Sequence, residues 1–427
     1  EASSTIGGKI STVEIAGVPI DGGPDAFLVR EPEMRELCTS LGIAEKLVAP
    51  ISRSAKIWVD GSMKALPKSQ FLGIPLDFDE LSSLNLISPE GIAIAQNDLT
   101  AKDNAQDEDE TVGSLIRRRL GDEVMEKLVG PLLGGINAGD PDTLSLKSGV
   151  PYLASAASLD ASLVRSIQKF IHASDRNPET PVFLTHPEGL DKVVDALGKE
   201  LEEKIILNER IQSVHAKDKK WILEGQKGSY ETDSVILTTP SYISSSIIET
   251  TNEKIADLLS TIKYASMAFA LFAFPSKEVR PFDGSGFLVA KSEGLLMTAC
   301  SWSSSKWEHL NDQEATFVRV SAGRADDDRA FNLDDEELTS ALLEELTRIV
   351  DIQATPIESQ VIRWPRSFPQ YEVDHSDKVN QIQKLLRNEA PGIFVAGAAF
   401  NGLGLSACIR DGKVNAQRAE SYLGALS

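Results

Sequence analysis

The order of hydrophobic and polar residues near the start of the chain changes from strand-like runs to helical spacing. A strand is predicted over Lys9–Ile20, before a glycine turn at residues 22–24. Apolar residues at i, i+3, i+4 and i+7 then predict an amphipathic helix over Met34–Leu41, which ends at Gly42. The chain therefore opens with a strand, a turn and a helix.

Helical spacing dominates the next segment, from about Pro75 to Ser174, after a hairpin predicted over Ala55–Leu66. Thr111–Val129 is predicted to form one helix. The stretch Asp103–Glu110 carries five acidic residues and no basic ones, which favours a solvated loop. This segment is interpreted as a mostly helical insertion.

Strand patterns return after residue 181, and strands dominate between Met267 and Val361. One long helix interrupts the strands of that stretch, with an apolar face over 338–349 and acidic residues 334–337 in its first turn, where the helix dipole favours negative charge. A Gly-rich turn and a last helix from about Leu405 close the sequence. The strand predictions are a hairpin over Val214–Leu223 and single strands over Val235–Pro240, Met267–Phe274, Gly286–Val289, Ala315–Ser321, Gln360–Trp364 and Gly392–Gly397.

Similar strand patterns occur at the start, in the middle and at the end of the chain, with a helical block and an antiparallel block between them. This arrangement predicts an α/β protein with one discontinuous domain and two insertions. No internal repeat is visible. The predicted boundaries are 1–55, 179–262 and 381–427 for the discontinuous domain, 56–74 and 263–380 for a mixed-sheet domain, and 75–178 for the helical insertion.

Composition narrows the function classes. The chain has 427 residues, enough for two or three domains, and a net charge of −21 from 43 basic and 64 acidic residues. Such a surface repels phosphate backbones, which argues against nucleic-acid binding but leaves room for a local cationic pocket. No apolar run reaches about 18 residues, so no transmembrane helix is expected, and no signal peptide is visible. The few, widely spaced cysteines favour a reducing cytoplasm.

Cysteine and histidine usage argues against metal and disulfide chemistry. The three cysteines are far apart, and no two of the five histidines have metal-ligand spacing. We therefore expect no metal site. The cysteines are Cys38, Cys300 and Cys408, and the histidines are His172, His186, His215, His309 and His375.

The turn at Gly402-Leu-Gly404-Leu-Ser-Ala407 fits the pattern G-x-G-x-x-A between a strand and a helix. Backbone N–H groups at such a helix start can meet a diphosphate. Only 20 residues follow Ala407, too few for the second strand and acid of a primary dinucleotide fingerprint. A plain strand-to-helix turn is the alternative interpretation.

The segment Glu1–Lys9 supplies a matching pattern. A carboxylate such as Glu1 suits a ribose diol because it accepts two hydrogen bonds, and paired glycines let backbone approach a cofactor. The strand and G-x-G-x-x-G loop that precede such a glutamate in flavoproteins with two dinucleotide-binding motifs are not in this sequence. We expect about 30 residues ahead of Glu1, a genuine truncation being the alternative.

These motifs together resemble the oxygen-dependent porphyrinogen oxidases, meaning protoporphyrinogen oxidase and coproporphyrinogen III oxidase, over essentially the whole chain. The order and number of the motifs separate this family from other flavin amine oxidases and desaturases. Beyond Glu1–Lys9, the motifs are Asp21–Phe27, Arg117–Val124, Pro131–Ser145, Gly286–Val289, Ser305–Trp307, Arg363–Tyr371 with His375, and Val395–Ile409.

The resemblance implies a discontinuous Rossmann-like FAD-binding domain, a mixed-sheet substrate domain and a helical insertion of the membrane-binding type. It places FAD against residues of both chain ends. Glu1 and Ala2 would hold the ribose, Ile211 the adenine edge, and the turn before the last helix the diphosphate and flavin. The implied cofactor residues are Glu1, Ala2, Lys9, Gly23, Pro24, Asp25, Ala26, Ile211, Trp364, Leu403, Gly404 and Leu405.

For the substrate, the resemblance implies a flat apolar site with cations at its rim. Lys56 is a candidate partner for a propionate, although the usual cation position falls on Ala55 and a solvated Lys56 is the alternative. Arg117–Arg119 and His375 are interpreted as structural residues. Cys408 is interpreted as a buried packing residue. No side chain is assigned as a catalytic base. The implied substrate residues are Gly135, Leu288, Val289, Met297, Phe368 and Lys56.

The implied reaction removes six hydrogens from a porphyrinogen in three hydride transfers to FAD, with O₂ as acceptor and H₂O₂ as product. The negative charge favours a cytoplasmic protein, at most peripheral to the inner face of the membrane, and slightly favours coproporphyrinogen III with its four carboxylates over protoporphyrinogen IX. Another flavin oxidase and a truncated, non-catalytic homologue are the alternatives. A homodimer and a transient contact with the next haem-pathway enzyme are open partner hypotheses.

Overall fold

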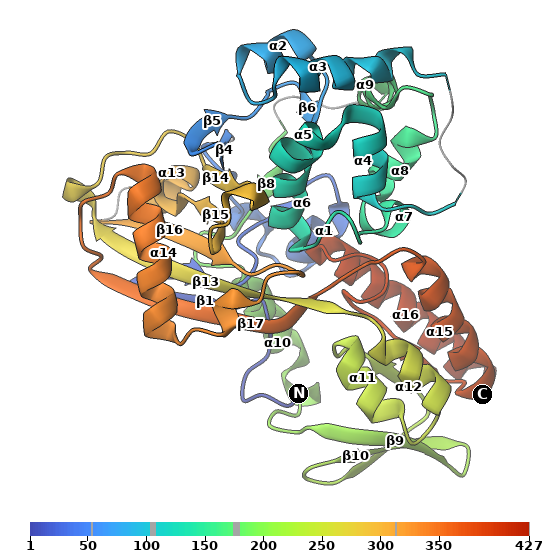
Figure 1. Cartoon of the computed structure of the whole chain (residues 1–427). Coiled ribbons are helices and arrows are strands. Elements are labelled where there is room, and N and C mark those ends of the chain that lie inside the picture. Colours follow the sequence, from blue (N-terminus) through green and yellow to red (C-terminus); the bar gives the residue numbers. More distant parts are fainter. Residues whose placement is uncertain (53, 103–107, 174–179, 312–313, 427) are drawn as a thin grey trace.

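A computed structural model describes residues 1–52, 54–102, 108–173, 180–311 and 314–426 of the chain. Its largest element is a seven-stranded sheet in the order β17-β13-β16-β15-β14-β4-β5 (Figure 1). Neighbouring strands are antiparallel except for β14 and β4. The strands are β4 (Ala55–Val59), β5 (Ser62–Ala65), β13 (Tyr264–Pro275), β14 (Gly286–Val289), β15 (Met297–Ser301), β16 (Ala315–Ala322) and β17 (Glu358–Pro369).

Strand β13 is apolar along its whole length because both faces of the sheet are covered. Phe272 and Phe274 face one layer, whereas Phe269 and Leu271 face the opposite one. Side chains alternate between the two faces of a strand, so a doubly covered strand reads as a continuous apolar run. The strand predictions in this region are confirmed, and β13 and β17 extend beyond the predicted ends.

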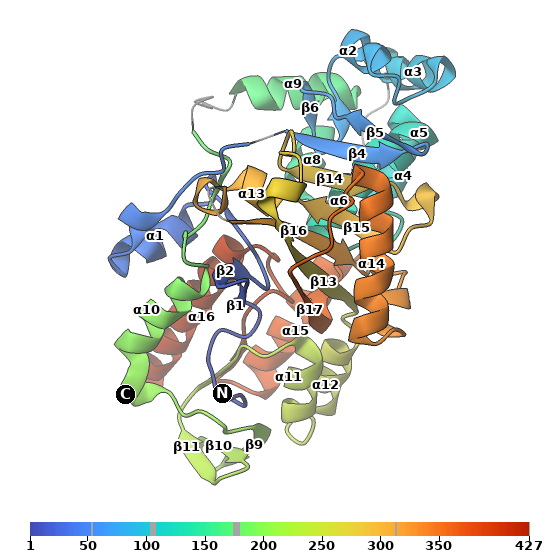
Figure 2. The same ribbon diagram turned by 90° about the vertical axis from the view of Figure 1, so that its left-hand side faces the viewer.

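Helix α14 (Asp335–Val350) covers one face of this sheet (Figure 2). Asp334 caps it, since its carboxylate accepts from the Glu337 N–H while the Glu337 side chain accepts from the Asp334 N–H. Leu338, Leu342 and Leu346 are fully buried against β13 and β16. The predicted long helix is therefore confirmed.

A block of short helices packs on the other face of the sheet at its β4–β14 end (Figure 1). The predicted single helix over Thr111–Val129 is wrong. Gly121 adopts φ +88° and ends α4, and α5 and a π-helical turn over Met125–Val129 follow. The helices are α2 (Phe78–Ser83), α3 (Pro89–Gln96), α4 (Val112–Leu120), α5 (Asp122–Val124), α6 (Gly130–Asn137), α7 (Leu146–Gly149), α8 (Pro151–Ala157) and α9 (Leu163–Ala173).

The single strand predicted over Lys9–Ile20 is also wrong. The segment is a hairpin, with β1 (Thr12–Ile15) antiparallel to β2 (Val18–Asp21). Ala16 and Gly17 turn the chain with φ of +49° and +74°, as a two-residue hairpin loop requires. Ile15 and Ile20 then pack under the sheet.

The remaining elements form a second region around a parallel pair of strands, β12 (Val235–Leu237) and β18 (Ile393–Val395). Helices α11, α12 and α15 pack with this pair in one apolar cluster and lie together in Figures 1 and 2. Helices α1 and α10 pack with the start of α16 in a separate cluster. The predicted hairpin over Val214–Leu223 is confirmed as β9 and β10, which a third strand extends. The elements are β9 (Ile211–Lys217), β10 (Lys220–Gly225), β11 (Ser229–Thr232), α1 (Pro32–Ser40), α10 (Asp191–Leu201), α11 (Ser241–Ile248), α12 (Glu253–Ser260), α15 (His375–Glu389) and α16 (Leu405–Leu426).

The acidic stretch predicted to be a solvated loop lies partly outside the described residues, at 103–107. In its described part, Asp109 and Glu110 bind neighbouring side chains, so the prediction of a solvated loop is wrong for these two residues. Asp109 accepts from the Ser145 hydroxyl at 2.6 Å, and Glu110 pairs with Arg118 at 2.6 Å. These carboxylates tie the entry to α4 to its neighbours. No helix in the described ranges is both long and apolar enough to span a membrane.

Candidate functional site

The loop over residues 21–26, which begins at the last residue of β2, is held by hydrogen bonds from the large sheet. The indole N–H of Trp364 on β17 donates to the Gly22 carbonyl at 2.7 Å, and a guanidinium N–H of Arg319 on β16 donates to the Gly23 carbonyl at 2.6 Å. The Gly22 N–H donates to the Ser11 carbonyl at 2.8 Å. The path of this loop therefore depends on residues some 300 positions later in the chain.

Gly23 fits a cradle that admits no side chain. A Cβ at Gly23 would lie 1.8 Å from the carbonyl oxygen of Lys9, closer than atoms can approach. The Lys9 ammonium donates to the Ser367 carbonyl at 2.7 Å, and burial lowers the pKa of Lys9. The structure thus brings Lys9, Gly23 and β17 together, as the resemblance requires.

The Gly-rich turn before α16 is fixed by two buried polar side chains. The Tyr371 hydroxyl donates to the Ala398 carbonyl at 2.7 Å and accepts from the Gly402 N–H at 2.8 Å. The Asp411 carboxylate accepts from the Gly397 N–H at 2.8 Å. Both contacts orient the N-terminus of α16, where free N–H groups favour an anion.

Removal of the Tyr371 hydroxyl tests this arrangement. Tyr371→Phe is expected to lower the free energy of unfolding by about 1–3 kcal/mol, because it leaves the partly buried Gly402 N–H and Ala398 carbonyl unpaired. Urea denaturation measures the change. Tyr242→Phe is the control, since its hydroxyl makes one 3.4 Å bond to the Arg366 carbonyl. Equal losses in the two variants would contradict the assigned role of Tyr371.

The predicted ribose and adenine residues also lie side by side. The Glu209 N–H donates to the Glu1 carbonyl at 2.8 Å, and the Asn208 N–H donates to the Ser3 carbonyl at 2.9 Å. Ile211 begins β9 directly after this contact. Glu1 and Ile211, which are 210 positions apart in sequence, thus reach one corner of the molecule.

An apolar cluster lies next to the loop of residues 21–26. Trp364 and Phe368 pack against Met267 and Phe269 of β13 and against Ala138 at the end of α6. Gly135 lies on α6, where an added Cβ would meet the Leu288 side chain at 3.0 Å. The structure therefore brings the predicted residues Gly135 and Leu288 into contact, and places Phe368 and Trp364 in one cluster.

Three predicted substrate residues lie on the opposite face of the sheet. Val289 and Met297 are buried in the cluster under α14. Lys56 pairs with the exposed Asp283 at 3.1 Å, and its ammonium lies 5.7 Å from the ring centre of Trp302. Neighbouring residues of a strand point to opposite faces of the sheet, so Val289 faces α14 whereas Leu288 faces the helical block. The solvated alternative for Lys56 agrees with this geometry.

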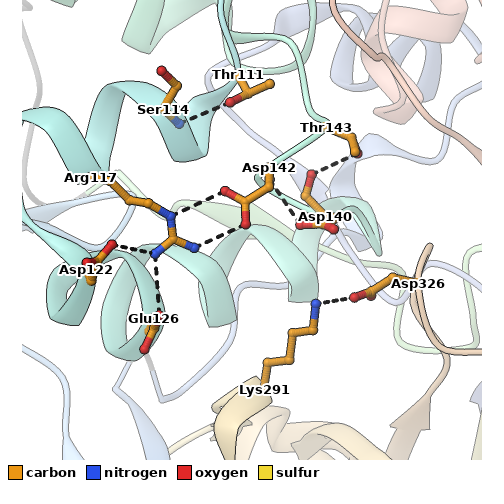
Figure 3. A network of polar contacts seen from close by, with 10 residues as sticks. All are labelled: Thr111, Ser114, Arg117, Asp122, Glu126, Asp140, Asp142, Thr143, Lys291 and Asp326. Carbon is orange, nitrogen blue, oxygen red and sulfur yellow. Dashed lines mark hydrogen bonds and ion pairs between the residues drawn. The ribbon is translucent and has the colours of Figure 1, made fainter.

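Arg117 of α4 makes several ion pairs with neighbouring acidic side chains (Figure 3). Arg117 reaches Asp122 at 2.9 Å, Glu126 at 3.4 Å and Asp142 at 3.1 Å. Nearby, Lys291 pairs with Asp326. The network joins α4 and α5 to the segment after α6, as the structural interpretation of Arg117 predicts.

Four polar residues at the site were not predicted from sequence: Lys306, Arg319, Tyr371 and Asp411. Their common feature is a polar side chain that is buried or partly buried in the fold, and a sequence does not report burial. Lys306 and Tyr371 lay within recognised motifs without an assigned role. His375, predicted to be structural, stacks on Tyr371 with ring centres 3.9 Å apart, and burial lowers its pKa to about 4.

Comparisons with known proteins agree with this geometry. The family of flavin containing amine oxidoreductases matches residues 1–419. The coproporphyrinogen III oxidases of Bacillus subtilis and Staphylococcus aureus are 31% and 30% identical over 99% of this chain, and the alignments cover 91% and 93% of those proteins. The crystal structure of a proposed protoporphyrinogen oxidase from Exiguobacterium sp. 255-15 has a TM-score of 0.89 and 28% identity, over 99% of this chain and 92% of that one.

The chain therefore belongs to the flavin containing amine oxidoreductases, and within them to the porphyrinogen oxidase family. The predicted α/β class and the FAD cofactor are confirmed. The described residues fit FAD on two structural grounds. Gly23 lets the loop of residues 21–26 pack directly on the backbone of Lys9. At Gly404, no atom of the described residues lies within 4 Å of an added Cβ, apart from its chain neighbours and its own helix backbone, so this turn is open to a cofactor.

Proposed function

We propose that this chain oxidises a porphyrinogen to a porphyrin in haem biosynthesis. FAD would accept hydride in three two-electron steps, and O₂ would accept the electrons and give H₂O₂. Residues 1–55, 179–262 and 381–427 would bind FAD, and residues 56–74 and 263–380 would bind the substrate. The proposal rests on the shared family and on the geometry around Trp364.

Trp364 is the observation that carries the proposal. Its indole N–H holds the Gly22 carbonyl of the predicted flavin loop, while its ring packs with Phe368 and Met267. One side chain thus links the predicted cofactor surface to an apolar wall suited to a tetrapyrrole macrocycle. The wall would orient the substrate against the flavin and exclude water.

Coproporphyrinogen III is slightly preferred over protoporphyrinogen IX in this proposal. Two relatives with at least 30% identity carry the name coproporphyrinogen III oxidase. The tetracarboxylate is also the more water-soluble of the two compounds. Glu1, Ala2, Lys9, residues 23–26, Ile211 and the turn over Leu403–Leu405 would contact FAD, and Gly135, Leu288 and Phe368 the substrate.

Growth of porphyrin fluorescence in air tests the proposal. Purified protein with added FAD is expected to accelerate fluorescence from coproporphyrinogen III more than from protoporphyrinogen IX, above the rate without protein. Phe368→Leu should raise KM because it shortens the predicted wall. Phe282→Leu is the control, because Phe282 lies in the cluster under α14 and not in the predicted wall. Its ring stacks on Trp302, with the ring centres 4.8 Å apart.

The outcomes separate the alternatives. Faster oxidation of protoporphyrinogen IX would reverse the substrate preference and keep the reaction. No acceleration of either substrate, with FAD bound, would refute the proposed activity. A parallel sample with a dinucleotide-binding strand and loop of about 30 residues ahead of Glu1 shows whether FAD binding depends on that segment.

A further inference from the structure

Two basic side chains, Arg319 and Lys306, bind the loop of residues 21–26. Arg319 projects from β16 and bonds the carbonyls of Gly23 at 2.6 Å and Asp21 at 3.5 Å. Lys306, at the end of α13 (Ser303–Lys306), pairs with the Asp25 carboxylate at 2.6 Å. Consecutive parts of the loop are therefore tied to the substrate sheet by charged groups.

Burial strengthens the contacts of Arg319, whereas Lys306 and Asp25 are partly exposed. Arg319 is only 8% exposed, and its guanidinium lies 3.8 Å from the ring centre of Phe269. Burial lowers the pKa of Arg319, while Asp25 and Asp21 oppose that effect. Although burial acts in the opposite direction, Lys306 and Arg319 lower the pKa of Asp25 to about 2. Asp25 is thus ionised at neutral pH, and the ion pair persists.

The Arg319 guanidinium contacts both the loop of residues 21–26 and the apolar cluster beside it. Its N–H groups hold backbone carbonyls of the loop, and its face covers Phe269, which packs in the cluster with Trp364 and Phe368. A planar group with several donors can make both contacts at once, whereas a lysine ammonium has no planar face to stack. A displacement of Arg319 would therefore affect the loop and the apolar wall together.

We propose that Arg319 and Lys306 are positioning residues, which hold the backbone of residues 21–26 in the conformation that receives the flavin ring. Neither residue needs to touch the cofactor for this role. The inference rests on the proposed placement of FAD along this loop. It goes further by assigning the fit of the flavin to two side chains of the substrate sheet and its flanking helix.

Two measurements on Arg319→Met and Lys306→Met test the inference. In FAD-free protein, amide hydrogen exchange of residues 21–28 is expected to rise at least about tenfold, while the hairpin at 55–65 stays protected. In FAD titrations, the Kd should rise about tenfold, as loss of one charged hydrogen bond implies. Arg319→Lys should recover part of the affinity, because it keeps the charge.

Arg363→Met is the matched control. Arg363 lies on β17, pairs with Asp335 at 2.7 Å and bonds two carbonyls, but these contacts lie at α14 and its entry. This variant should lose stability without a change in loop exchange or FAD affinity. Should Arg319→Met fail to fold, Lys306→Met and Asp25→Asn carry the test, because they break only the outer ion pair.

Unchanged exchange at residues 21–28, or equal loss of FAD affinity in the Arg319 and Arg363 variants, would overturn the inference. Failure of the wild-type chain, with or without the added upstream segment, to bind FAD would overturn its cofactor part. A wild-type protein that binds FAD and shows the loop effects, yet oxidises neither porphyrinogen, would refute only the proposed reaction. The two proposals can therefore fail independently.

Discussion

Gly404→Ala is expected to weaken FAD binding by about 10- to 100-fold, the range that an extra methyl group costs in a filled site. The stability of the FAD-free protein should not fall. In the described structure, a Cβ built on Gly404 meets no atom within 4 Å outside its chain neighbours and its own helix backbone, so the methyl group would point into open space. Flavin fluorescence titration measures the affinity, and thermal unfolding of the FAD-free protein measures the stability.

Gly412→Ala provides the control for this variant. Gly412 lies in the same helix, α16, and its Cβ position is equally open within the described structure. A methyl group there should leave FAD affinity unchanged and favour the helix slightly, since alanine is the better helix former. Equal FAD affinity in Gly404→Ala and wild type would contradict the predicted approach of the cofactor to this turn.

Asp21→Asn is expected to become increasingly stable relative to wild type as the pH rises from 4 to 8. Burial raises the pKa of Asp21 to about 7 from a usual value of 3.8. The folded state therefore holds a proton that the unfolded state releases. The stabilisation from this proton is complete below pH 3.8 and is lost as the pH rises through 7.

Asparagine carries no proton to lose, and its oxygen can still accept from the Leu190 N–H and the Thr12 hydroxyl. Between pH 4 and pH 8, the free energy of unfolding of Asp21→Asn should therefore gain about 4 kcal/mol relative to wild type, at 1.36 kcal/mol per pKa unit. Urea denaturation at several pH values measures the difference. A difference that stays constant across this range would show that Asp21 titrates normally.

Helix α14 and six of the seven strands of the large sheet could be predicted from local pattern, whereas β15, α10, α11, α12 and α15 were not predicted. The helix that became α14 combined a leucine repeat with an acidic first turn, and the capping box at Asp334 and Glu337 agrees with both. The two wrongly predicted elements had local causes, since Ala16-Gly17 turned a strand into a hairpin and Gly121 divided a helix.

The candidate site was predictable only where a motif carried it. Gly23, Trp364 and the turn at Gly404 belong to recognised segments, and the structure brings Gly23 and Trp364 to one loop. Lys56, Val289 and Met297 lay in matching segments too, but their side chains face the α14 side of the sheet. Strand orientation depends on register, and one residue of difference exchanges the two faces.

The sequence by itself determined the family, the cofactor and the general order of strands and helices, because motif and periodicity are properties of neighbouring residues. Only the tertiary structure decided which charges are buried and which loop they hold. Arg319 and Lys306 lie nearly 300 residues from the carbonyl and the carboxylate that they bind. Such contacts arise from packing of the sheet against the loop, and their strength comes from the exclusion of water, which no local pattern records.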